Sequence, residues 1–172
     1  NEAPVYKNPY AELENHWAKA EITELVEKGI VKGDGNSLNL ETNVTRAEFI
    51  TMIIRSLEFD IVPYNDTFLD VSQDAWYADF IQTAFDSGII SGDGKNAKPD
   101  VNITRQEAAI MLSNNFDNKA GILSDFTDNE QISEWAQEGV GVAFELGLIK
   151  GYEDGSFAPL KAIRRDEAMV LI

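Results

Sequence analysis

The stretch "VTRAE" at residues 44–48 indicates an internal repeat, because the near-copy "ITRQE" follows at residues 103–107, 59 positions later. Thr45 and Glu48 have the spacing of a capping box, in which the threonine oxygen and the glutamate carboxylate each accept a backbone N–H. Apolar residues at helical spacing follow, such as Phe49, Met52 and Ile53. Each copy therefore predicts the start of a helix.

Capping does not explain the arginine in the middle of each copy. A cation in the first turn lies against the positive end of the helix dipole, at a cost of roughly a few tenths of a kcal/mol. One explanation is a bound anion, since free backbone N–H groups, the dipole and a guanidinium would together favour a carboxylate. The other is an ion pair with an aspartate of a neighbouring unit. The residues alone leave both open.

Three tryptophans extend the repeat beyond these stretches. Trp17, Trp76 and Trp135 are 59 residues apart, and each is followed twelve residues later by a glycine and four residues after that by another. The glycines are Gly29, Gly88 and Gly147, then Gly33, Gly92 and Gly151. One unit is therefore written three times. Each unit predicts a first helix that ends at its glycine, a loop rich in glycine and aspartate, and a second helix.

Composition excludes several classes of partner. The 172 residues are 44% hydrophobic, enough for a substantial core. The net charge of −16 repels nucleic acid and acidic membrane surfaces. No apolar run approaches the roughly 20 residues that span a bilayer. The chain has no cysteine for a disulfide or a thiolate metal site. We therefore expect no nucleic-acid partner, no membrane insertion, no metal and no cofactor.

The repeat predicts a mainly α protein of three helix–loop–helix units. We place the units at residues 1–59, 60–116 and 117–172, with the linkers at the start of the second and third. Each unit is too small to close its own core, so we expect the three to pack together as a pseudo-threefold body. Residue 172 falls about two turns into the last helix by the helical repeat, so we expect the native chain to continue.

The order of these motifs resembles the S-layer homology repeat. The matching stretches are "FLDV" at residues 68–71, a tryptophan that opens a helix, "GIISGDG" at 88–94, "ITRQEAA" at 103–109 and "GLIKGYEDGSFAP" at 147–159. The resemblance covers roughly residues 10–172 and is threefold, as that family usually is. It implies a three-lobed module with its second helices bundled around a central axis and grooves between the lobes.

The resemblance also implies a function. That family anchors surface-layer proteins or exoenzymes to bacterial cell walls by binding secondary cell-wall polysaccharide, commonly with pyruvylated N-acetylmannosamine. It implies an extracellular location in the cell wall or S-layer, with self-assembly left to the rest of the parent protein. The arginine of the repeat is associated with the ligand carboxylate, and tryptophan and glycine-loop residues line the groove. Carried over by position, the ligand-binding residues are Arg46, Arg105, Arg165, Trp17, Trp76, Trp135, Gly33, Gly92 and Gly151, with Arg164 beside Arg165.

The third copy, "IRRDE" at residues 163–167, departs from the pattern. Arg164 replaces the capping threonine, and one extra residue in the preceding loop makes Arg165 the counterpart of Arg105. The charge of Asp166 would lie close to any bound carboxylate. We therefore expect the third groove to be weaker, or rearranged around two arginines. For the tryptophans, we expect the ring body to be mostly core, with an edge left for a sugar.

Two other classes of function are weighed against a glycan anchor. Carboxylate pairs such as Asp34 and Glu48 could serve glycoside hydrolysis, but catalysis needs one asymmetric site and the notable residues here come in threes. The acidic loops lack the ligand pattern of a calcium-binding EF-hand. A protein-binding scaffold stays an alternative. It predicts one large apolar patch across the lobes, whereas a glycan anchor predicts separate grooves that each hold an arginine near a tryptophan.

Overall fold

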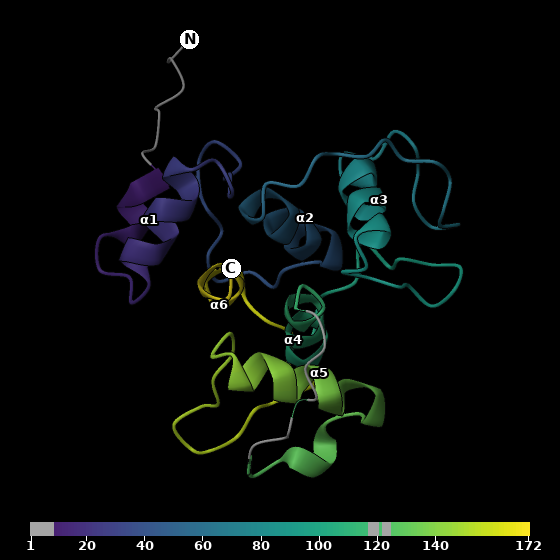
Figure 1. The fold of residues 1–172 in the computed structure, drawn as a ribbon. Coiled ribbons are helices and arrows are strands. Elements are labelled where there is room, and N and C mark those ends of the chain that lie inside the picture. The colour runs from purple at the N-terminus through teal and green to yellow at the C-terminus, as the bar shows by residue number, and fades with distance from the viewer. Residues whose placement is uncertain (1–8, 117–120, 122–124) are drawn as a thin grey trace.

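This computed structural model describes residues 9–116, 121 and 125–172, which contain six α-helices and two short 3₁₀ helices joined by loops (Figure 1). They are η1 Pro9–Leu13, α1 Lys19–Glu27, α2 Arg46–Ser56, α3 Ala78–Asp86, α4 Arg105–Ser113, η2 Asn129–Gln131, α5 Glu134–Glu145 and α6 Arg165–Val170. The prediction of a mainly α fold is confirmed. Most of the linker expected between the second and third units lies outside the described residues.

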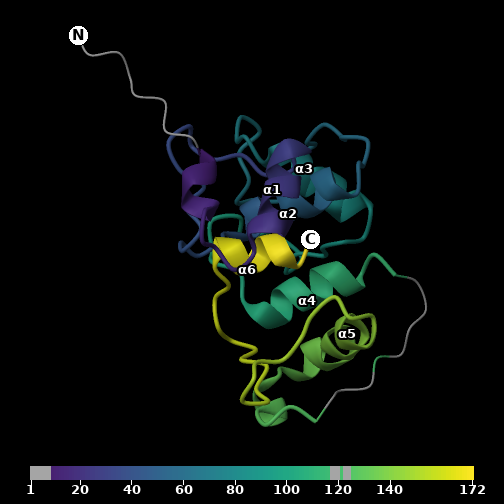
Figure 2. The same cartoon turned by 90° about the vertical axis from the view of Figure 1, so that its left-hand side faces the viewer.

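The helices form a closed ring of three pairs. Each second helix packs on the first helix of the next repeat: α2 on α3, α4 on α5, and α6 back on α1. The second helices lie near the middle and the first helices outside them (Figure 1). The turned view shows α6 between α1 and α4 (Figure 2). The return of α6 to α1 confirms a closed pseudo-threefold module.

Three backbone hydrogen bonds close this ring at its centre. The N–H of Val44 donates to the carbonyl of Ile163 (3.0 Å), that of Ile103 to Val44 (2.9 Å) and that of Ile163 to Ile103 (3.1 Å). All three side chains are fully buried. Each residue directly precedes the N-cap of a second helix, so the bonds hold the three helix starts around one axis.

The start of each second helix is sealed by the next repeat. The N–H groups of Arg46 and Ala47 donate to the carbonyls of Val101 and Pro99, both at 2.9 Å, and the other two second helices repeat this pattern. The capping box satisfies the glutamate N–H and the N–H of the threonine itself, as predicted for "VTRAE" and "ITRQE". The expectation of free N–H groups for an anion is therefore wrong, because neighbouring backbone already accepts them.

The first helices end as predicted, at a glycine with left-handed backbone. Gly29, Gly88 and Gly147 have φ of 71°, 78° and 72°. In each case the glycine N–H and the next N–H bond back to the last turn, which is a Schellman motif. This turn directs the chain from the first helix into the loop that borders the functional site.

A carboxylate early in each repeat holds the segment before the second helix. Asp70, from "FLDV", accepts the N–H groups of Ala97 and Lys98, both at 2.8 Å. Asp128 does the same for Phe157 and Ala158 in the third repeat. The sequence reasoning missed this role, although the recurring acidic residue two positions after an aromatic was its signal.

Replacement of Thr104 tests the contribution of the caps to stability. Thr104→Ala is expected to lower the free energy of unfolding by about 1 kcal/mol, because the Glu107 N–H loses its side-chain acceptor. Thr104→Ser keeps that oxygen and is the matched control. Chemical denaturation measures both variants, and equal stability of the alanine and serine variants would contradict this role.

Candidate functional site

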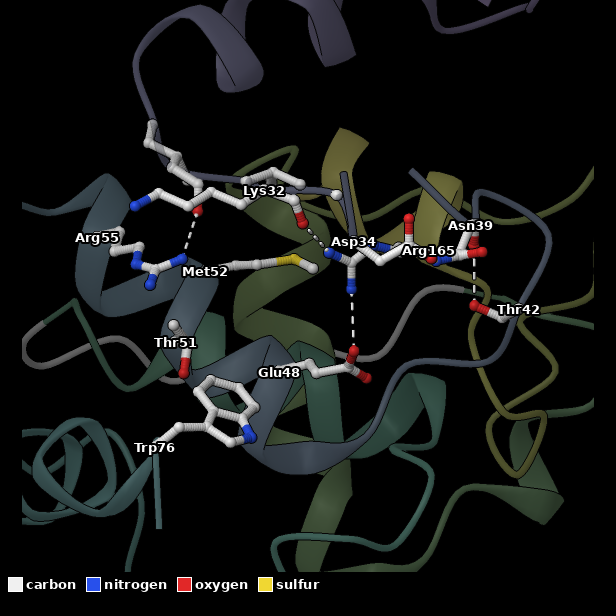
Figure 3. Close-up of a pocket in the computed structure, with 13 residues that line it drawn as sticks. Lys32, Asp34, Asn39, Thr42, Glu48, Thr51, Met52, Arg55, Trp76 and Arg165 are labelled. Carbon is white, nitrogen blue, oxygen red and sulfur yellow. Dashed lines mark hydrogen bonds and ion pairs between the residues drawn. The ribbon is translucent and has the colours of Figure 1, made fainter. Parts of the chain in front are cut away.

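A cavity of about 640 Å³, which we call the first groove, is bordered by all three repeats (Figure 3). Arg165 of α6, Glu48 of α2 and the loop around Lys32 form its walls, and Trp76 comes from the second repeat. Arg165 bridges the walls: its Nη1 is 3.0 Å from Glu48 Oε1, and its Nη2 donates to the Lys32 carbonyl at 3.0 Å. The arginine of one repeat thus forms a hydrogen bond to the loop of the next repeat around the ring.

A second cavity of about 580 Å³, the second groove, repeats this arrangement one interface further on. Arg46 donates from Nε to the Ala97 carbonyl (3.0 Å), and its Nη1 lies 3.1 Å from Glu107 Oε1. Trp135, from the third repeat, lines this groove. Of the two explanations of the arginine, the ion pair across repeats is therefore present in both grooves, with glutamate in place of the expected aspartate.

At the third interface, Arg105 has different surroundings. Its Nε and Nη2 donate to the carbonyls of Phe157 (2.8 Å) and Lys150 (2.9 Å). The ring of Tyr152 lies over the guanidinium, with its centroid 4.5 Å from Cζ. Glu167 stands where Glu48 and Glu107 stand in the other repeats. It accepts from Tyr152 Oη instead, at 3.1 Å.

The tryptophans lie at the surface. Trp17, Trp76 and Trp135 are 63%, 59% and 64% exposed, so the expectation that their ring bodies are mostly core is wrong. The neighbouring alanines, Ala18 and Ala136, are fully buried instead. A small buried residue lets the helix approach the core, which leaves the indole beside it in solvent. Trp76 and Trp135 are therefore available at the edges of the two grooves.

The loop glycines are required by packing. A Cβ on Gly92 would lie 2.5 Å from the Phe68 ring, and one on Gly151 would lie 2.9 Å from Phe126. A Cβ on Gly33 would collide with the Ser37 carbonyl. Gly33 and Gly92 also line the first and second grooves.

Arg164 lines neither groove, and its side chain shares no hydrogen-bond partner with that of Arg165. It pairs with Asp166, to which it donates from Nε at 3.1 Å. Asp166 is fully buried and also accepts from Trp17 Nε1 (3.2 Å) and the Glu167 N–H (2.8 Å). This carboxylate thus takes over the acceptor role of the missing threonine. Burial alone would raise the pKa of Asp166, but these hydrogen bonds outweigh it and lower the pKa.

Charge in the grooves differs from that of the whole chain. Lys32, Arg55 and Arg165 line the first groove against Asp34 and Glu48, although the chain as a whole has a net charge of −16. Hydrogen bonds from Asn39 and from loop N–H groups lower the pKa of Asp34. A hydrolytic acid needs a raised pKa, so this carboxylate fits a turn better than catalysis.

Metal sites and membrane-spanning helices are two further classes of feature to consider in the described ranges. No cluster of three or more histidine, cysteine, aspartate or glutamate residues there could hold a metal ion. No helix in the same ranges has the length and apolar character needed to cross a membrane.

Known proteins share this repeat. A family model described as the S-layer homology domain matches residues 10–50, 67–109 and 125–169. The chain is 38% identical to an amylopullulanase of Thermoanaerobacterium thermosulfurigenes over 97% of its own length and 9% of that protein's. It is 37% identical to exoglucanase XynX of Acetivibrio thermocellus, over 95% and 16% of the two lengths. It is 34% identical to the surface-layer 125 kDa protein of Lysinibacillus sphaericus, over 80% and 12%.

Acid should destabilise the module through Asp166 and Glu167. Burial opposes ionisation of both, but hydrogen bonds lower their pKa values below the ordinary 3.8 and 4.5. A lowered pKa gives stability that is complete above the ordinary value and is lost as the pH falls through the folded-state value. We therefore expect the midpoint temperature of thermal unfolding to decrease once the pH drops below about 4.5.

Asp166→Asn should lower the midpoint at pH 7 and flatten its decline in acid. Asp60→Asn, at an exposed linker carboxylate, is the control and should follow the wild-type curve. Thermal unfolding followed by circular dichroism from pH 7 to pH 3 measures all three proteins. Parallel curves for the wild type and Asp166→Asn would rule out this carboxylate as a source of the acid sensitivity.

Proposed function

The chain belongs to the S-layer homology domain family and is a cell-wall anchoring module, and we propose that it binds an acidic, pyruvylated cell-wall polysaccharide in its inter-lobe grooves. The relatives place it at the bacterial cell surface, since some are S-layer and cell-surface proteins. The chain spans only 9–16% of the first two relatives, both named as enzymes. The activity and cargo of the parent protein are therefore separate proposals.

One observation supports the proposal most strongly: an arginine and an exposed tryptophan line the same cavity at each of two separate interfaces. Arg165 with Trp76, and Arg46 with Trp135, combine a donor for a carboxylate with a flat apolar surface for a sugar ring. A guanidinium has five N–H donors. Two protein acceptors hold each of these guanidinium groups, so donors remain for a ligand.

The glutamate partners hold Arg46 and Arg165 in a fixed orientation. Glu48 and Glu107 are themselves fixed by the capping boxes, so each guanidinium is oriented before a ligand arrives. A ligand carboxylate would also meet the negative charge of the glutamate. Lys32 and Arg55 offset that charge in the first groove, whereas Lys98 in the second is paired with Asp93. The first groove is thus a local cationic position on an acidic module, whereas Arg46 and Lys98 in the second groove are balanced by Asp93 and Glu107. Both grooves are far less acidic than the chain as a whole, which favours an anionic glycan there over the rest of the surface.

The separation of the grooves favours a glycan anchor over a protein scaffold. Each pairing of arginine and tryptophan has its own cavity at its own interface, as expected for a ligand with repeating units. Modest affinity at each site is sufficient, because two sites on one module and many units on one polysaccharide multiply the overall affinity.

Wall binding tests the proposed function directly. The module should sediment with purified Gram-positive wall sacculi and lose that binding once the secondary polysaccharide is chemically removed. Sacculi treated in parallel without loss of polysaccharide are the control. Undiminished sedimentation with stripped sacculi would refute the proposal.

The tryptophans allow a test that spares the fold. Trp76→Ala with Trp135→Ala should weaken binding to sacculi roughly fivefold or more, since each aromatic contact contributes about 0.5–1.5 kcal/mol. Both rings are mostly exposed, so the thermal midpoint should stay near that of the wild type. Leu69→Ala, at a residue that is 80% exposed, is the matched control. Wild-type affinity of the double variant would exclude the indoles from the site.

A further inference from the structure

The third loop places a tyrosine where the other two loops have an aspartate. The Tyr152 N–H donates across its loop, as the N–H groups of Asp34 and Asp93 do in theirs. In the first two loops the aspartate side chain then accepts N–H groups of the turn. The extra residue of the third loop transfers that role to Asp154. The side chain at position 152 is therefore released from the turn.

The side chain of Tyr152 packs its ring over the Arg105 guanidinium. Its ring centroid lies 4.5 Å from the guanidinium carbon, and its hydroxyl donates to Glu167 at 3.1 Å. Lys161 Nζ donates to both, at 3.0 Å to the tyrosine oxygen and 3.0 Å to the glutamate. The hydrogen bonds to Tyr152 and Glu167 outweigh burial and raise the pKa of Lys161. The arginine, the tyrosine, the glutamate and the lysine thus form one connected cluster.

The polar groups that correspond to those of the first and second grooves are engaged within the protein at the third interface, although the Trp17 ring is as exposed as its two counterparts. Arg105 is buried at 8% exposure, and the side chains of Arg46 and Arg165 are 12% exposed, so the difference lies in the groups around the guanidinium. Glu167 bonds Tyr152 and Lys161, whereas its counterparts bond the arginine. The Trp17 indole donates to Asp166, whereas in the described part of the chain the indoles of Trp76 and Trp135 have no hydrogen-bond acceptor.

We propose that Tyr152 fills the third interface in place of a ligand, so that the module takes two units of an anionic glycan and not three. This inference rests on the proposed function, because it concerns the third copy of the same site. The aromatic ring occupies the open face of the guanidinium, and Lys161 satisfies the carboxylate beside it. The irregularity of the third repeat therefore closes the Arg105 interface and leaves Arg165, which faces the first repeat, in an open groove.

Indole resonances of the wild-type chain test this without any substitution in the site. The ¹⁵N-labelled module is titrated with the methyl glycoside of pyruvylated N-acetylmannosamine, and Trp→Phe variants assign the three indole signals. The signals of Trp76 and Trp135 should shift with added sugar while that of Trp17 stays in place. A Trp17 shift over the same concentration range would overturn the inference and leave the proposed function standing. If all three signals stay fixed, the proposed function itself fails.

Calorimetry with the same sugar tests the role of the tyrosine. The wild type should bind two equivalents, and Tyr152→Ala should bind three. Tyr152→Phe keeps the ring over Arg105 and should stay at two. Thermal unfolding checks that each variant is folded. Three equivalents for the wild type, or two for a folded Tyr152→Ala, would show that Tyr152 does not fill the site.

Discussion

The ring of backbone hydrogen bonds among Val44, Ile103 and Ile163 is the constraint on which the rest of the module depends. Each repeat donates once and accepts once, so no repeat holds its place without the other two. Two residues further along, the chain places an arginine at the surface of the next repeat. The grooves are consequently properties of the interfaces, and an isolated repeat would contain only part of a site.

The arginine has a structural role and, in our proposal, a ligand role. Arg46 and Arg165 bridge two repeats through a glutamate and a carbonyl, and both face a cavity with an exposed tryptophan. A guanidinium suits both tasks, because its planar fork presents more donors than one neighbour can accept. The same contacts that close the ring thus set the orientation of the binding group.

The sequence predicts the helix ends correctly, but it does not predict which distant residues contact one another. Thr45 with Glu48 and the glycine at 88 mark helix ends because their hydrogen bonds stay within a few residues. The partner of Arg165 lies 117 residues away, and repeat spacing alone does not identify a contact of that kind. The tryptophans were misjudged because helical spacing does not reveal which of two adjacent residues, Trp17 or Ala18, turns toward the core.

A crystal structure of the module with a pyruvylated N-acetylmannosamine glycoside would show which residues hold the sugar. We expect the sugar carboxylate within hydrogen-bonding distance of Arg46 and Arg165, with the sugar rings against Trp135 and Trp76. We also expect that the ring of backbone hydrogen bonds is unchanged from the free module. A sugar bound away from these arginines, or only on the outer surface of the first helices, would contradict these expectations.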